Sequence, residues 1–344
     1  MQQRTLGQDG PRVGPIGLGC MGMSWAYAES SRDDMDSIAT IREAIDRGVA
    51  LIDTADIYGD GHNESLVGRA VTARRDEVVL ATKCGLIVDD LETKRMHRDG
   101  SPEHIRAAVR ASLTRLGTEV IDLYYLHRVD EHVPLVESWA AMAELVTAGL
   151  VRRIGLSEVD VDQAAAAQAI HPVAAIQSEL SLWSRDPLGD DAAGRGGDAG
   201  VHLAVGRDED AGSANNLIAW CRRNGAAFVP FSPLGRGFLT GALDASTTFE
   251  QSDFRSQLPR FTTAAREANQ KIVDLVREVA DSKDATAAQV ALAWVLAQGE
   301  HVIPIPGTRR STHLRTNLAA ADVLLTGDEL ARLNDAPLAV GTRY

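Results

Sequence analysis

Cysteine is scarce in this sequence, and none of it is paired. The three cysteines, Cys20, Cys84 and Cys221, form no Cys-x-x-Cys motif that could hold a metal or cycle between dithiol and disulfide. The nine histidines form no His-Glu-x-x-His motif and no cluster with cysteine. The sequence therefore predicts a protein without a metal, in the reducing environment of the cytoplasm.

Long hydrophobic runs and an excess of basic residues are also absent. No apolar stretch of signal-peptide length follows the first residues, and nowhere do about 18 uncharged apolar residues stand together, so we expect neither export by such a signal nor a membrane span. The 48 acidic residues exceed the 35 basic ones, which gives a net charge of -13. This balance argues against nucleic acid or anionic lipid as a partner.

The remaining composition is that of an ordinary globular protein. Of the 344 residues, 44% are hydrophobic and 24% are charged. A chain of this length buries about three quarters of its surface on folding. We expect residues 1–344 to form one domain around one large core.

Short apolar runs of strand length alternate with segments of helical period along the chain. The predicted strands are eight: residues 16–19, 50–53, 78–82, 121–126, 153–156, 174–177, 227–230 and 302–305. The predicted helices are residues 32–47, 63–73, 101–116, 135–148, 160–169, 213–224 and 266–296. Eight strands that are apolar on both faces are typical of a closed parallel barrel, since a doubly wound sheet usually has about five to seven.

We therefore predict an α/β fold, a (β/α)8 TIM barrel in a single domain. Residues 4–14, with the turn pair Asp9-Gly10, predict an N-terminal β-hairpin. Two long segments, residues 88–100 and 187–214, predict loops on one rim. The second is rich in glycine and acidic residues, so we expect a mobile rim insertion, either a lid over bound nucleotide or a tolerated surface loop.

One motif suggests a different nucleotide-binding fold. Gly17, Gly19 and Gly22 match the G-x-G-x-x-G pattern of dinucleotide-binding sheets. In that pattern the third glycine opens a helix that meets the pyrophosphate. Here residues 23–27 intervene before any helical period begins. We therefore interpret the glycines as a tight loop at the mouth of the barrel.

Polar residues follow three neighbouring strands of the predicted barrel. Asp53 and Tyr58 come after the second strand, Lys83 ends the third, and His127 ends the fourth. Each alone is an ordinary loop, packing or solvated residue. Together they place an acid, a base, an imidazole and a phenol on the rim where barrel enzymes carry their active sites. A buried Lys83 there needs a charge partner, which Asp53 supplies.

Five motifs in this order and spacing resemble those of the aldo-keto reductases, from about residue 4 to residue 334. The motifs are residues 53–59 (DTADIYG), 81–83 (ATK), 125–127 (YLH), 231–237 (FSPLGRG) and 303–309 (IPIPGTR). The resemblance implies a (β/α)8 barrel that reduces aldehydes or ketones with NADPH and no metal. It also implies a catalytic tetrad of Asp53, Tyr58, Lys83 and His127.

The chemistry of carbonyl reduction suits these four residues. Hydride attack builds an alkoxide that must be protonated, and a free tyrosine with a pKa of about 10 is a weak acid at neutral pH. We expect the Lys83 ammonium to lower the pKa of Tyr58, and Asp53 to keep that ammonium charged and aimed. His127 can hydrogen-bond the substrate oxygen or relay the proton.

The resemblance also implies a cofactor site, with some departures from the family. Its predicted residues are Ser157, Gln177, Phe231, Ser232, Leu234, Gly235, Arg236, Gly307, Thr308, Arg309 and Asn317. Glu158 stands where many members carry Asn beside the nicotinamide carboxamide. His313 and Thr316 replace an Arg and a Glu of the adenosine grip, so we expect only moderate selectivity for NADPH over NADH.

Four further residues at or beyond strand ends are expected to line the substrate pocket: Met23, Trp25, Ile87 and Arg128. The sequence thus predicts a cytoplasmic, NADPH-dependent aldehyde or ketone reductase acting on a small-molecule carbonyl. One alternative is a nucleotide-binding redox-sensing or regulatory subunit with little turnover. Another is an aldolase that forms a Schiff base on Lys83. The physiological substrate and the oligomeric state are left open.

Overall fold

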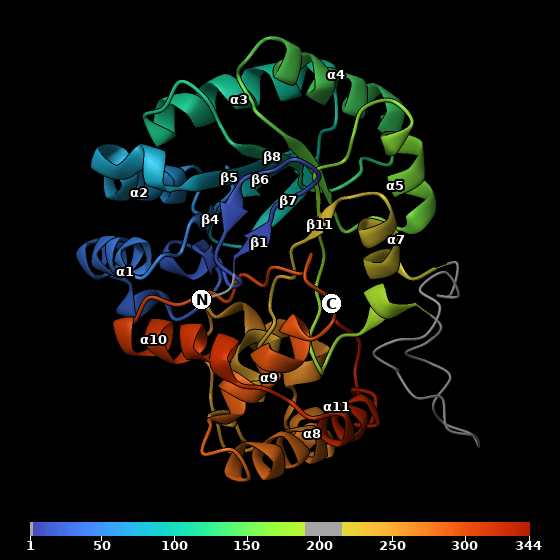
Figure 1. Ribbon diagram of the computed structural model, residues 1–344. Coiled ribbons are helices and arrows are strands. Elements are labelled where there is room, and N and C mark those ends of the chain that lie inside the picture. The colour runs from blue at the N-terminus through green and yellow to red at the C-terminus, as the bar shows by residue number, and fades with distance from the viewer. Residues whose placement is uncertain (1–2, 190–214) are drawn as a thin grey trace.

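A parallel sheet with helices around it forms the body of the computed structural model, which describes residues 3–189 and 215–344 (Figure 1). The sheet runs in the order β11-β10-β9-β8-β5-β4-β3, and every neighbouring pair is parallel. Its strands are β3 (Leu18–Gly19), β4 (Leu51–Asp53), β5 (Val79–Cys84), β8 (Leu123–Leu126), β9 (Ile154–Ser157), β10 (Ala175–Gln177) and β11 (Ala227–Phe228). Seven of the predicted strands are thus confirmed in type.

The eighth predicted strand, residues 302–305, closes the barrel without being a regular strand. It bridges β11 at Phe228 and Val302, and the residues after it bridge β3 at Gly19 and Gly307. Pro304 and Pro306 have no N–H to donate, so on the side of β3 these two residues only accept hydrogen bonds, and no continuous ladder forms there. Gly17 N donates to the Pro304 oxygen at 2.9 Å, and Ile303 N to the Phe228 oxygen at 2.8 Å. The fold is the predicted (β/α)8 barrel.

The helices that surround the barrel include the seven predicted segments, with two differences: one predicted helix is divided in two, and the two helices after residue 310 were not predicted. They are α1 (Asp34–Asp46), α2 (His62–Val71), α3 (Pro102–Leu116), α4 (Leu135–Thr147), α5 (Val161–Gln168), α7 (Leu217–Arg223), α8 (Thr263–Asp281), α9 (Ala287–Leu296), α10 (Ser311–Ala319) and α11 (Gly327–Asn334). The predicted helix 266–296 is two helices, because Asp284 has a φ of 51° and Thr286 starts α9 with a capping box. No helix in the described ranges is long and apolar enough to cross a membrane.

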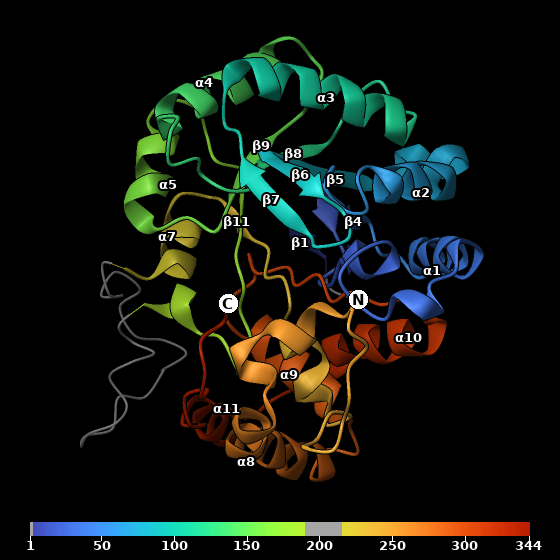
Figure 2. The ribbon, with the colours of Figure 1, turned by 180° about the vertical axis from the view of Figure 1, so that it is seen from behind.

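Two hairpins lie at opposite ends of the barrel, as Figures 1 and 2 show from the two sides. The predicted N-terminal hairpin is confirmed by the antiparallel pair β1 (Arg4–Thr5) and β2 (Arg12–Val13). The expectation of a plain loop over residues 88–100 was wrong, because β6 (Leu86–Asp90) and β7 (Arg95–Arg98) pair there across a bulge. The predicted insertion 187–214 lies outside the described residues, except for residues 187–189.

Alternate residues of the strands build two separate cores. Inward-facing residues of the strands, together with Leu6 and Val13 of the first hairpin, form the core inside the barrel. The residues between them, such as Ile52, Leu80 and Tyr124, belong to the larger core under the helices. The strands are therefore apolar on both faces, as a barrel strand must be.

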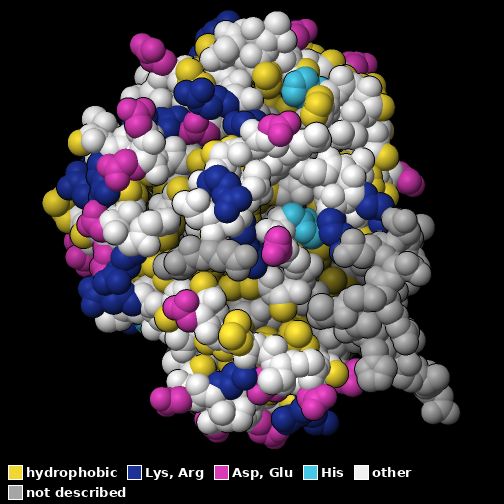
Figure 3. All heavy atoms as spheres, in the orientation of Figure 1, with side chains coloured by type: hydrophobic (Ala, Val, Ile, Leu, Met, Phe, Trp, Pro, Cys, Tyr) yellow, Lys and Arg dark blue, Asp and Glu magenta, His cyan; other side chains and the backbone are white. Residues whose placement is uncertain are grey.

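The outer surface at the end where the strands begin is mixed in charge. Figure 3 shows Lys and Arg side chains interspersed with Asp and Glu over this face, which carries the first hairpin. The net charge of -13 is therefore not gathered into one acidic patch on the face in view.

Candidate active site

The inward rows of the barrel end in the polar residues that the sequence analysis singled out. Side chains of a strand point to one face at every second residue. On β4, the inward residue Leu51 is therefore followed by Asp53. On β5, Lys83 follows Val79 and Ala81, and after β8, His127 follows Leu123 and Tyr125. By the same register, inward rows end at Ser157, Gln177, Phe231 and Gly307. Strand periodicity thus brings the predicted site residues to one end of the barrel interior.

Lys83 lies at the centre of the predicted tetrad. Its side chain is fully buried, and Nζ donates to Asp53 Oδ1 and to the Thr54 carbonyl oxygen, both at 2.6 Å. Nζ also lies 3.4 Å from Tyr58 Oη and 5.1 Å from the centre of the Tyr58 ring. Gln177 Nε2 donates to the other oxygen of Asp53 at 2.8 Å. The acid, the cation and the phenol therefore form one connected network.

Burial and charge act in opposite directions on the groups of this network. Burial lowers the pKa of Lys83, but the neighbouring Asp53 and Tyr58 oxygens together raise it by more than burial lowers it. The net pKa of Lys83 therefore lies above its ordinary value. Burial raises the pKa of Tyr58, and the Lys83 charge opposes that rise without overcoming it. Lys83 thus acts on Tyr58 in the predicted direction, but the net pKa of Tyr58 lies above its ordinary value. The missing factor is desolvation of the phenolate.

His127 faces Tyr58 across the site. Their rings meet edge to face with centroids 6.0 Å apart. Burial, with the positive charges of Arg128 and Lys83, holds the pKa of His127 well below its usual range. The imidazole is therefore neutral at pH 7, with one ring nitrogen protonated and the other an acceptor. Its Nδ1 is buried and has no hydrogen-bond partner among the residues that the structure describes.

Two residues predicted for the nicotinamide end lie beside the tetrad. Ser157 and Gln177 are opposite each other in the β9–β10 register, and both are buried. Because Gln177 Nε2 is used by Asp53, its carboxamide oxygen is left to accept a hydrogen bond. Arg128, predicted for the substrate pocket, donates to Ser157 Oγ at 3.1 Å and to the His127 carbonyl oxygen at 2.6 Å.

The loop after β11 turns sharply through left-handed backbone. Ser232, Gly235, Arg236 and Gly237 have φ values of 49°, 56°, 54° and 97°. Runs of this kind form concave sites whose N–H groups can hold phosphate oxygens. The Arg236 guanidinium is nearly buried and pairs with Glu179 at 2.8 Å. Phe231 packs against the inner core, and Leu234 against the outer one.

The predicted adenosine end lies where the closing segment enters α10. Arg309 donates to the Ala28 carbonyl oxygen at 3.3 Å and to Ser31 Oγ at 3.1 Å. Burial and the nearby charges of Arg32 and Arg310 lower the pKa of Arg309. Positive groups beside a helix N-terminus favour the binding of an anion, because the anion offsets the repulsion between them. Thr308 and Gly307 precede this group, and Asn317 is buried on α10.

The other residues predicted for the substrate pocket differ in their surroundings. Trp25 packs in a small apolar cluster with Tyr58, directly beside the tetrad. Met23 is buried in the outer core, and Ile87 lies half-buried on β6.

Several buried polar residues near the site were missed by the sequence analysis. Thr82 Oγ1 donates to Glu64 Oε1 at 2.6 Å, and Arg115 pairs with the other oxygen of Glu64 at 2.6 Å. Glu179 and Arg343 also belong to the missed set, and they pair with residues far away in the sequence. Glu64 could have been suspected because it follows Tyr58 closely at the start of a helix. No local signal marks Arg343.

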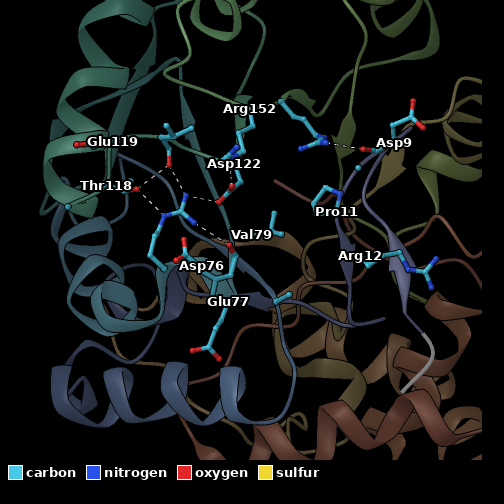
Figure 4. A pocket seen from close by; sticks show the side chains of 17 residues that line it. Asp9, Pro11, Arg12, Asp76, Glu77, Val79, Thr118, Glu119, Asp122 and Arg152 are labelled. Atoms are coloured by element: carbon cyan, nitrogen blue, oxygen red, sulfur yellow. Dashed lines mark hydrogen bonds and ion pairs between the residues drawn. The ribbon is translucent and has the colours of Figure 1, made fainter.

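A hollow of about 740 Å³ lies at the other end of the barrel, where the strands begin (Figure 4). It is lined by residues of the first hairpin and of strand starts. Its central charges are already satisfied, since Arg75 and Arg152 both pair with Asp122, at 2.7 and 3.0 Å. It contains none of the predicted site residues. In the described part of the chain, no three His, Cys, Asp or Glu side chains are grouped as metal ligands.

Comparison with known proteins shows the family to which the chain belongs. The profile of the family described as "Aldo/keto reductase family" matches residues 15–337. The chain belongs to the aldo/keto reductase family. It is 37% identical over 337 residues to a protein of Glycine max described as "Probable aldo-keto reductase 1", covering 98% of this chain and 89% of that one.

Solved structures of the family have the same fold. A glycerol dehydrogenase from Gluconobacter oxydans is similar with a TM-score of 0.80 and 28% identity, over 97% of this chain and 94% of that one. An aldo/keto reductase from Klebsiella pneumoniae in complex with NADP and acetate is similar with a TM-score of 0.69 and 27% identity, over 99% and 97% of the two chains. The chain thus has the same fold as a relative whose solved structure contains NADP.

Proposed function

We propose that this chain reduces an aldehyde or a ketone to an alcohol with NADPH, and that Tyr58 is the proton donor. The observation that carries the proposal is the contact of Lys83 with both Asp53 and Tyr58 at the end of the barrel interior. A phenol beside a buried ammonium is suited to giving up a proton and regaining it.

The residues around the tetrad fit NADPH. Ser157 and the free oxygen of Gln177 can hold the nicotinamide carboxamide, and the ring of Phe231 can lie against the nicotinamide. The loop of Ser232, Leu234, Gly235 and Arg236 suits the pyrophosphate, because its left-handed backbone forms a concave turn. Gly307, Thr308, Arg309 and Asn317 suit the adenosine half, since the charges of Arg32 and Arg310 oppose that of Arg309 and a bound anion would relieve this repulsion. When bound, NADPH supplies the hydride.

Tyr58 is protonated at neutral pH, because the ordinary pKa of tyrosine is about 10 and burial raises it further. Tyr58 Oη can therefore donate to the carbonyl oxygen as negative charge grows there. Lys83 then stabilises the phenolate that is left behind, and Asp53 holds Lys83 in place. Neutral His127 can donate a second hydrogen bond to the same oxygen from Nε2, in the tautomer that leaves Nδ1 as the acceptor.

The tetrad also argues against the aldolase alternative. A Schiff base forms from a neutral amine, whereas the pKa of Lys83 is raised by Asp53 and Tyr58 against the effect of burial. Lys83 is therefore held as an ammonium ion, which is not a nucleophile. The regulatory alternative differs from the proposal in turnover alone.

The substitution Tyr58→Phe tests the proposal. We expect it to lower kcat for aldehyde reduction by about 10²–10⁴-fold, the usual contribution of a general acid. The dissociation constant for NADPH should stay near its wild-type value, because Tyr58 holds no predicted cofactor group. Stopped-flow NADPH oxidation and NADPH fluorescence titration measure the two quantities. Near-normal turnover of the variant would remove Tyr58 from this role, and wild-type protein that binds NADPH without turnover would favour the regulatory alternative.

A further inference from the structure

The segment after α11 returns to the barrel and is firmly held there. The buried side chain of Asn269 donates to the Val340 carbonyl oxygen at 3.0 Å and accepts from Val340 N at 2.7 Å. Gly341 follows with a φ of 93°, and a Cβ at this position would lie 3.2 Å from the backbone of Arg260. Arg260 Nε donates to the Gly341 oxygen at 3.0 Å. Figure 2 shows this end of the chain between α7 and α9, beside the strands.

This anchoring delivers Arg343 to two carboxylates of the proposed cofactor site. Its guanidinium pairs with Glu158, and its Nε lies 3.5 Å from Glu179 Oε2. Asp186, which is well exposed, is 3.6 Å away on the outer side. The ring of Tyr344 lies 5.1 Å from the guanidinium carbon of Arg343 and 5.1 Å from that of Arg236. Two arginines and two glutamates are therefore packed together with one aromatic ring.

Glu158 has an unusual backbone that places its side chain in this group. It directly follows Ser157 at the end of β9 and has a φ of 55°, which a glutamate seldom adopts. Its N–H donates to the Gln177 carbonyl oxygen at 3.0 Å, and its Oε1 accepts from Glu179 N at 2.9 Å. The expectation that Glu158 faces the nicotinamide carboxamide has a competitor, because Arg343 already binds Oε2 of this carboxylate.

We propose that Arg343 is a positioning residue of the cofactor site, which neutralises Glu158 and Glu179 and so allows the pyrophosphate to bind beside them. This inference rests on the proposed function. Arg343 is the ion-pair partner that the structure gives Glu158, whereas Arg236 is already paired with Glu179 at 2.8 Å. Without Arg343, Glu158 would therefore be left without this partner and would repel the phosphates.

The position of Arg343 also explains why a glutamate is tolerated next to Ser157. An ionised carboxylate that is largely buried is costly unless it is paired and hydrogen-bonded. Glu158 meets both conditions through Arg343 and through the N–H of Glu179. The basic partner comes from the other end of the chain, so cofactor affinity depends on the anchoring of segment 340–344.

A double-mutant cycle tests this role. The variants are Arg343→Met, Glu158→Gln and the pair together, with Arg343→Lys as the conservative replacement. The control is Arg332→Met, which removes an exposed ion pair with Glu278 on α11. The dissociation constant for NADPH is measured by fluorescence titration, and kcat is measured at saturating NADPH. Melting temperatures show that each variant is folded.

We expect Arg343→Met to raise the dissociation constant for NADPH by about ten-fold or more, since a buried charge loses its partner. Arg343→Lys should recover part of the loss, and kcat at saturation should change by less than about three-fold, as for a loss of uniform binding. In the double variant, the dissociation constant should return toward that of wild type, because no unpaired carboxylate remains at residue 158. Arg332→Met should bind NADPH as wild type does.

Two results would overturn the inference. One is an Arg343→Met protein with wild-type affinity for NADPH. The other is a double variant that is as weak as Arg343→Met alone, which would show that Arg343 does not act through Glu158. If the methionine variant fails to fold, Arg343→Lys tests the inference in its place. A folded lysine variant that has lost all of its affinity for NADPH would contradict the inference, because lysine keeps the positive charge that is proposed to neutralise Glu158. Wild-type protein that binds no NADPH refutes the proposed function instead.

Discussion

Replacing Lys83 by methionine should damage both the stability and the activity of this protein, and the two effects can be separated. Methionine fills a similar volume but has no charge. Lys83 is fully buried and the Asp53 side chain is only 5% exposed, so the substitution leaves a buried carboxylate without its cation. Of the two side chains that hold Asp53, only Gln177 would remain.

The expected size follows from the cost of a broken buried pair, which is about 3–5 kcal/mol. Unfolding entropy of about 2.1 cal/mol/K per residue amounts to about 0.7 kcal/mol/K for 344 residues. The melting temperature of Lys83→Met should therefore fall by about 4–7 °C. Turnover should fall by about 10²–10⁴-fold, because the phenolate of Tyr58 loses its stabilising charge.

Adding Asp53→Asn to Lys83→Met separates the two effects. The double variant has no buried charge at either position, so its melting temperature should return to within about 2 °C of wild type. Its turnover should stay as low as that of the single variant. Scanning calorimetry and NADPH oxidation measure the two quantities. A Lys83→Met protein with a wild-type melting temperature, or a double variant that regains turnover, would contradict the reasoning.

Three further predictions follow from single residues. Burial, Arg128 and Lys83 lower the pKa of His127 from its ordinary value of 6.5, so below that pH the unfolded chain binds a proton that the folded chain does not bind. The free energy of unfolding should therefore fall as the pH drops below 6.5. In melting scans, His127→Asn should reduce the slope of this fall by up to about 1.4 kcal/mol per pH unit. Arg309→Ala should weaken NADPH much more than NADH in titrations, and equal losses would show that Arg309 does not read the 2′-phosphate. Gly19→Ala should cost about 1–3 kcal/mol in denaturant unfolding, since its Cβ would lie 2.8 Å from the Ile305 oxygen; the control Gly327→Ala, with open space around it, should cost nothing measurable.

The barrel and the tetrad could be predicted from sequence because both depend on local pattern. The alternation of apolar residues identifies strands, and the period of two then assigns Lys83 and His127 to the same side as the inner core. The motif around Asp53 and Tyr58 follows β4 directly, so its place needs no long-range information. Proline made the closing segment harder to assign, because Pro304 interrupts the ladder while keeping the extended chain.

The parts that sequence did not predict depend on contacts between distant residues. The pair of Glu158 with Arg343 joins positions that no motif connects. The sign of the pKa shift of Tyr58 was missed because it depends on the extent of burial, and sequence gave only the identity of the charged neighbour. The hairpin β6–β7 was missed because β7 is exposed along its whole length and shows no apolar alternation.

The segment that closes the barrel also determines when the molecule can become a barrel at all. During synthesis β3 and β11 are the open edges of a curved sheet until Ile303 and Gly307 arrive and pair with them. Between the synthesis of β11 and that of the closing segment, both of these strand edges are therefore open to other chains. The same late segment carries Gly307, Thr308 and Arg309, so a nucleotide that binds there would favour the closed form over the open one by mass action. A growing concentration of cofactor would then act as a folding aid for newly made protein.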